Sequence, residues 1–101
     1  MRMMLKVMVP IEKGNAAFKD GSLGQTIESV MKKLKPEAAY FGAIMEGKRC
    51  AMMIFDLTDP SQIVEIAEPL FLNLNAAVEF VPVMNADELQ KGMTKAGSKK
   101  K

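Results

Sequence analysis

Polar side chains that interrupt apolar strands are the first candidates for chemistry in this sequence. Lys6, Tyr40 and Glu79 each stand among apolar neighbours in segments with the alternation of a β-strand. The chain has no histidine, so these three residue types, or Glu46, would have to carry any acid–base step in an enclosed site. The alternative interpretation is that Lys6, Tyr40 and Glu79 form interface ion pairs or lie in water at strand ends.

Other residues of the predicted strands could also contribute to such a site. Met53 and Phe55 are expected to line a cavity together with the three polar residues. Glu46 and Arg49 flank a tight turn, where we expect a solvated ion pair rather than a site. Cys50 is expected to be a small buried hydrophobic side chain, because a redox role would need an exposed thiol in electropositive surroundings.

Composition excludes several kinds of site. With no histidine and one cysteine, one subunit cannot build a zinc site from Cys and His, a Ser-His-Asp triad or a Cys-His pair. The segment Gly21-Ser22-Leu23-Gly24 is too short for a phosphate-binding loop and lacks its lysine. We therefore expect neither a metal nor a cofactor.

The first half of the chain predicts one strand and one helix. Alternation predicts the strand over residues 3–11, with these side chains facing the core: Met3, Leu5, Val7, Val9 and Ile11. Residues 12–15 are expected to form a turn. The helical pattern is strongest from Ser22 to Leu34. We favour an earlier start near Asn15, with Phe18 extending the apolar stripe and a weak point at Gly21. Ser22 and Gln25 form a capping-box pattern, and Lys35-Pro36 should end the helix.

The second half predicts a hairpin, a helix, a strand and a short last helix. Strands are expected over residues 38–46 and 49–57, joined by a turn at residues 46–48. A helix should begin at Asp59-Pro60, with Gln62 completing a capping box, and Pro69 should kink it. A fourth strand spans residues 77–83. Asn85 then caps a helix that Gly92 should end.

This order of elements predicts the fold class. The order β-α-β-β-α-β indicates an α+β domain of the ferredoxin-like kind. It has a four-stranded antiparallel sheet, two helices on one face and a short C-terminal helix. We expect residues 1–94 to form the single domain and residues 95–101 to be a lysine-rich, solvated tail.

The second face of the predicted sheet is too apolar to be left in water. Two helices cover one face, yet the third strand carries large apolar residues in both registers, such as Met52 and Ile54 against Met53 and Phe55. An apolar area of that size is unusual on a soluble monomer. We therefore expect a homodimer with two-fold symmetry that packs sheet on sheet.

The chain resembles the dimeric α/β-barrel superfamily. The resemblance covers roughly residues 3–92 and depends on the element order, on Val78-Glu79-Phe80-Val81-Pro82-Val83-Met84, and on the capped helix after it. It is similar above all to the small bacterial members that have no assigned reaction. The resemblance implies a fold and a dimer, but no catalytic residue. Such proteins bind small ligands between helices and sheet or inside the barrel.

Three functions follow from these observations. The first is a dimeric module that binds a small apolar or amphipathic ligand or serves a structural role. The second is a cofactor-free isomerase or monooxygenase, which depends on the resemblance alone. The third and most remote is RNA binding, which would need aromatic residues on the exposed faces of the first and third strands.

Charge, length and hydropathy bear on location and partners. Without the four lysines after position 94, 10 basic residues face 12 acidic ones, so the folded body is slightly acidic and no nucleic-acid partner is expected. No apolar segment approaches the roughly 20 residues that span a bilayer. We expect no membrane partner and a cytoplasmic location.

Overall fold

The computed structural model describes residues 1–43 and 46–97 of the chain. The elements in these ranges are β1 (Arg2–Val9), α1 (Ile11–Asp20), α2 (Ser22–Leu34), β2 (Ala38–Gly42), β3 (Arg49–Asp56), α3 (Gln62–Leu74), β4 (Ala77–Pro82) and α4 (Ala86–Lys95). The strands form one antiparallel sheet in the order β2-β3-β1-β4. The protein is thus an α+β domain, compatible with the predicted ferredoxin-like arrangement.

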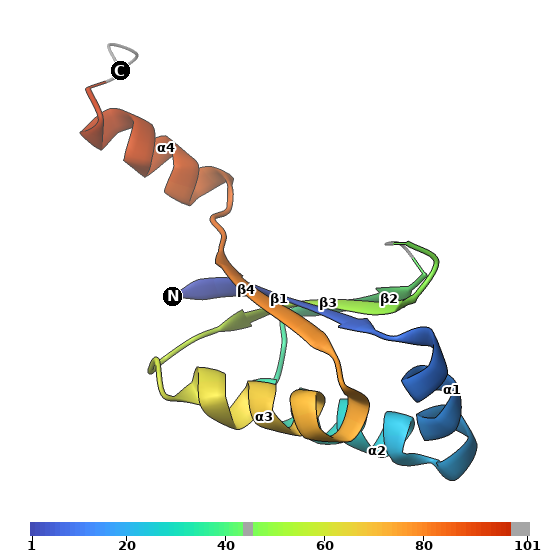
Figure 1. Ribbon diagram of the computed structural model, residues 1–101. Coiled ribbons are helices and arrows are strands. Elements are labelled where there is room, and N and C mark those ends of the chain that lie inside the picture. Colours follow the sequence, from blue (N-terminus) through green and yellow to red (C-terminus); the bar gives the residue numbers. More distant parts are fainter. Residues whose placement is uncertain (44–45, 98–101) are drawn as a thin grey trace.

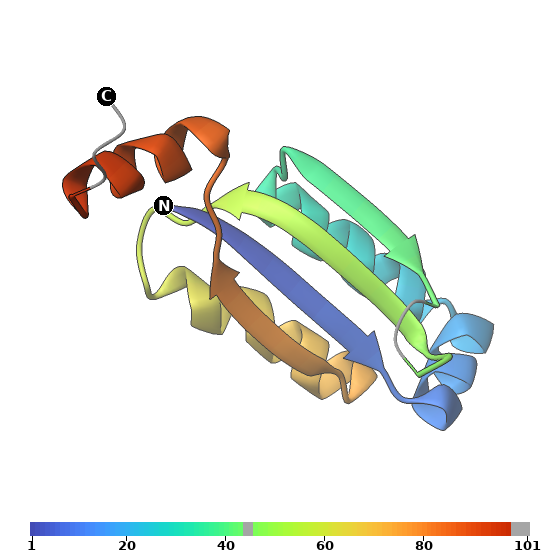
Figure 2. The ribbon, with the colours of Figure 1, turned by 90° about the horizontal axis from the view of Figure 1, so that it is seen from above.

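The helices are distributed unevenly about the sheet. Figure 1 shows α1, α2 and α3 on one side of it, while α4 projects away beyond one end. Seen from above in Figure 2, the opposite face of the four strands is left open by the helices. The core lies between the sheet and the three helices. Its most deeply buried side chains are Leu5, Val7, Val30, Met53, Phe55, Leu70 and Leu74.

Strand β1 shows the predicted alternation as far as Val9. Met3, Leu5, Val7 and Val9 are buried, and the even positions are partly exposed. The expectation for Ile11 is wrong, because Ile11 begins α1 and is 54% exposed. Pro10 ends the strand with a φ of −59°, which suits entry into a helix.

The predicted first helix is in fact two helices. Helix α1 occupies residues 11–20, including those expected to form a turn, and Gly21 separates it from α2 with a left-handed φ of 86°. The capping box at Ser22 does not form: Gly21 takes the N-cap position, and the Ser22 N–H donates to Asp20 Oδ1 at 2.8 Å. Phe18, expected on the buried stripe, is 68% exposed.

The two glycines near this break make a matched pair for a stability test. Gly21→Ala should lower the free energy of unfolding by about 1–2 kcal/mol, because alanine is strained at positive φ. Gly24→Ala should raise it by up to about 1 kcal/mol, since Gly24 lies inside α2 and a Cβ there meets nothing within 4 Å. Urea denaturation measures both. If both substitutions changed the free energy of unfolding in the same direction, the left-handed conformation at Gly21 would be contradicted.

The elements from residue 35 to residue 74 follow the prediction with shifted bounds. Helix α2 ends at Leu34, before Pro36, with Lys35 in the left-handed region. Strand β2 is shorter than predicted and ends at Gly42, and residues 44 and 45 lie outside the described residues. Helix α3 begins at Gln62, three residues after the predicted cap, and contains Pro69. The Gln62 side chain still accepts the Asp59 N–H at 3.1 Å.

Helix α4 has the predicted N-terminal cap and a different end. The Asn85 side chain accepts the Glu88 N–H at 2.9 Å, and the Glu88 carboxylate accepts the Asn85 N–H at 2.8 Å. This second bond, helped by the charge of Arg2, holds the pKa of Glu88 below its ordinary value. The helix passes Gly92 and ends at Lys95, before Gly97 at a φ of 98°. Of the predicted tail, residues 98–101 lie outside the described residues.

In the described part of the chain, no helix is both long and apolar enough to cross a bilayer.

Candidate functional site

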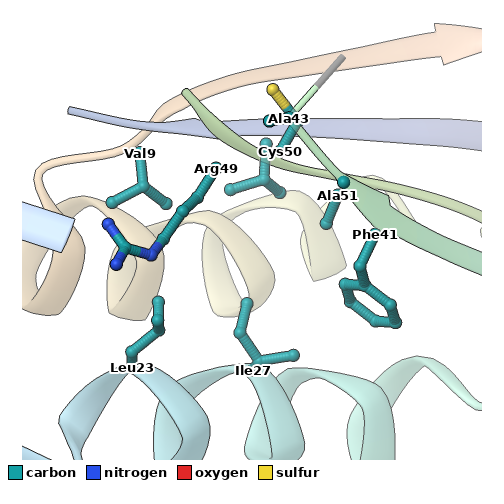
Figure 3. Close-up of a pocket in the computed structure, with 10 residues that line it drawn as sticks. Val9, Leu23, Ile27, Phe41, Ala43, Arg49, Cys50 and Ala51 are labelled. Atoms are coloured by element: carbon teal, nitrogen blue, oxygen red, sulfur yellow. The ribbon is translucent and has the colours of Figure 1, made fainter. Parts of the chain in front are cut away.

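A half-open pocket lies between α2 and the end of the sheet where β2 and β3 meet the helix layer. Its volume is about 380 Å³, at the lower end of the range for small-molecule sites. Figure 3 shows side chains from β1, α2, β2 and β3 turned toward this space. Its apolar wall is formed by Val7, Val9, Leu23, Ile27, Phe41 and Ala51.

The cation of the pocket is Arg49, the first residue of β3. Along the strand it shares a side with Ala51 and Met53 and therefore points toward the helices rather than into the hairpin turn. Its guanidinium lies between the sheet and α2 in Figure 3. The Arg49 Nη1 donates to Asn15 Oδ1 at 3.0 Å, and Cζ lies 5.9 Å from the centroid of the Phe18 ring.

The predicted pair between Glu46 and Arg49 is wrong. Glu46 is instead paired with Lys48, whose Nζ lies 3.1 Å from Glu46 Oε1. Among the described residues, no carboxylate lies within ion-pair distance of Arg49. Arginine stays charged in proteins, so the pocket holds a cation that its described neighbours do not neutralise.

Gly14 allows this guanidinium to pack against α1. A Cβ built on Gly14 would stand 2.8 Å from Arg49 Nη1 and 3.3 Å from Val9 Cγ1. Glycine inside a helix costs about 1 kcal/mol relative to alanine, and here the missing side chain gives the arginine its room. Gly14 is buried although its neighbours Asn15 and Ala16 are exposed.

A wider depression adjoins the pocket along the outer side of α2. Ile27 and Phe41 line both spaces and so stand between them. The depression also borders Glu28, Met31 and Lys32. A molecule that left the pocket toward this depression would therefore pass the apolar side chains of Ile27 and Phe41.

The residues proposed from the sequence lie in two other places. Glu79, Lys6 and Tyr40 share the open face of the sheet, since Lys6 pairs with Glu79 and Met52, and Met52 pairs with Tyr40. Lys6 Nζ lies 3.6 Å from Glu79 Oε1, and Tyr40 is 64% exposed. Met53 and Phe55 are on the opposite side, fully buried against the helices.

Cys50 is buried, as predicted, at 5% exposure. Its thiol donates to the Lys48 carbonyl at 3.2 Å. Elsewhere in the described chain, no cluster of three or more Asp, Glu, Cys or His side chains is placed to hold a metal ion.

Comparison with known proteins does not extend this description. The sequence matches no model of a known protein family, and no curated protein matches it. The class that the structure defines is a small α+β domain with one sheet face open and an apolar pocket under the other.

Proposed function

We propose that the protein is a homodimeric module that binds a small apolar or amphipathic molecule in the pocket between α2 and the sheet. The single observation that supports binding is the half-open space of about 380 Å³ with an apolar wall. An apolar occupant would take the surface of this wall out of water, which is favourable, and small-molecule sites are typically concave and mostly apolar.

The open face of the sheet supports the dimer. Its side chains are mainly apolar and form rows across the strands. One row contains the Lys6–Glu79 pair, Met52 and Tyr40. The next two rows consist of Ala38, Ile54, Met4 and Val81, and of Gly42, Cys50, Met8 and Ala77, while Arg2 and Asp56 lie at one end of the face. With strands about 4.8 Å apart, two such faces cover about 800 Å² in all, somewhat less than the roughly 1,000 Å² expected of a biological interface.

Helix α4 could add further buried area to the dimer interface. None of its residues is buried, and Leu89 and Met93 are 50% and 44% exposed. The radius of gyration is 16.2 Å, against about 13 Å for a compact domain of this length. We propose that α4 packs on the second copy of the chain, as in the dimeric α/β-barrel arrangement that the sequence resembles.

An enzyme of the cofactor-free kind is the less supported alternative. In the pocket wall, Arg49 is the ionisable side chain that faces the space, because the Cys50 thiol points to the open face of the sheet, and arginine does not exchange protons near neutral pH. Acid–base catalysis would therefore need Lys6, Tyr40 or Glu79, which only a second copy could enclose.

RNA binding has no support from the inner strands, whose open-face residues include no aromatic side chain.

Calorimetric titration with octan-1-ol and with octanoate tests the binding function. We expect saturable binding of at least one of them. Leu23→Trp should weaken it about tenfold or more, because the indole fills the pocket from α2. The matched control is Gln25→Trp, on the exposed side of the same helix. Absence of saturable binding by both probes, or an equal loss in both variants, would overturn the proposal.

A further inference from the structure

We propose that the ligand carries a carboxylate and that Arg49 binds it. This inference depends on the proposed binding function and names the chemical class of molecule that the pocket accepts: an apolar body ending in one planar anion.

The positive charge of Arg49 is placed beside apolar side chains. Arg49 lies beside the apolar wall on the helix-facing side of β3, among Val9, Leu23 and Ala51. The Arg49 side chain is half-buried, and a charge pair at a partly buried site is screened less by salt than one in open water. In the described chain the neighbours of the guanidinium are an amide oxygen, from Asn15, and the ring of Phe18.

The Arg49 guanidinium has more hydrogen-bond donors than its described neighbours use. A guanidinium has five N–H groups in a rigid fork, and one hydrogen bond, to Asn15 Oδ1, uses only Nη1. The planar fork matches a carboxylate through two parallel bonds, which are stronger than bonds between neutral groups. Asn15 and Gly14 hold the guanidinium from the α1 side, and so orient it before a ligand arrives.

The charge of the pocket wall disfavours ligands with other head groups. Apart from Cys50, Arg49 is the ionisable member of the wall, and no acidic residue belongs to it. A cationic amphiphile would meet a like charge, and a neutral one would leave the guanidinium without a counter-ion. An anionic amphiphile would place its apolar chain against the wall and its charged group beside Arg49.

Three probes with the same eight-carbon chain test the inference: octanoate, octan-1-ol and octyltrimethylammonium. For the wild-type protein we expect octanoate to bind about tenfold more tightly than octan-1-ol, and the cation to bind most weakly. Arg49→Met keeps an unbranched apolar side chain without the charge. It should weaken octanoate about tenfold and leave octan-1-ol within about threefold. Arg49→Lys, which lacks the fork, should lie between.

Gly14→Ala provides a second variant that keeps Arg49. Its methyl group would displace the guanidinium, so octanoate should weaken while octan-1-ol stays unchanged. Gly92→Ala on α4, where the added Cβ also meets nothing within 4 Å, is the matched control.

The outcomes separate the two proposals. If octanoate and octan-1-ol bind equally and neither variant discriminates between them, Arg49 only anchors α1 and the carboxylate inference is wrong, while the binding pocket stands. If neither probe binds, the proposed function itself is wrong.

Discussion

Ile54→Lys should convert the dimer into a monomer, raising the dissociation constant by a factor of about 100 or more. Ile54 lies on β3, an inner strand, and pairs with Met4 and with Ala38 on the open face. In a two-fold dimer the substitution buries two ammonium groups in one interface, and an unpaired buried charge costs several kcal/mol. Analytical ultracentrifugation at micromolar concentration gives the mass directly.

The control for this experiment is Val64→Lys. Val64 lies on α3, away from the open face, and is 61% exposed, so a lysine there should leave the dimer intact. Circular dichroism checks that both variants stay folded. A wild-type protein that sediments as a monomer, or an Ile54 variant that remains dimeric, would remove the sheet-on-sheet assembly.

Phe55→Ala should lower the free energy of unfolding by about 3–5 kcal/mol. Phe55 is 1% exposed, and its ring meets that of Phe80 edge to face at 6.3 Å between centroids. Truncation removes the buried apolar surface and leaves a cavity that the surrounding core refills only in part. Because domains of this size have about 5–15 kcal/mol in total, the loss is a large share of the stability.

Phe41→Ala is the matched control for the core substitution. Phe41 lines the pocket and is 54% exposed, so its removal should cost much less, about 1 kcal/mol. Chemical denaturation of both variants gives the comparison. A cost below about 1 kcal/mol for Phe55→Ala would mean that Phe55 lines open space instead of filling the core.

The parts of the fold that local patterns govern could be predicted from the sequence. Alternation identified the buried side of β1, the Asn85 and Glu88 pair identified the start of α4, and Pro36 identified the end of α2. The start of α1 could not be predicted in this way. Gly14 and Asn15 are typical of a turn, yet Gly14 is helical here because tertiary packing of Arg49 uses the space that its missing side chain leaves.

The pocket was missed for a related reason. Arg49 follows a turn, and its closeness in sequence to Glu46 suggested a solvated pair. The sequence nevertheless indicated where Arg49 points. Arg49, Met53 and Phe55 are separated by even numbers of residues along the strand, so all three side chains face the helices. The partners Asn15 and Phe18 lie more than 30 residues away in sequence, and only the folded chain brings them to the guanidinium.

The measurement that tests the central claim most directly is methyl-resolved NMR during a titration with octanoate. Methyl groups of Val7, Val9, Leu23 and Ile27 line the pocket, whereas those of Met4, Met8 and Ile54 lie on the open face of the sheet. With octanoate in the pocket, we expect saturable shifts at the first group and little change at the second. Shifts at the open-face methyls alone, or none at either group, would contradict a ligand site beneath the sheet.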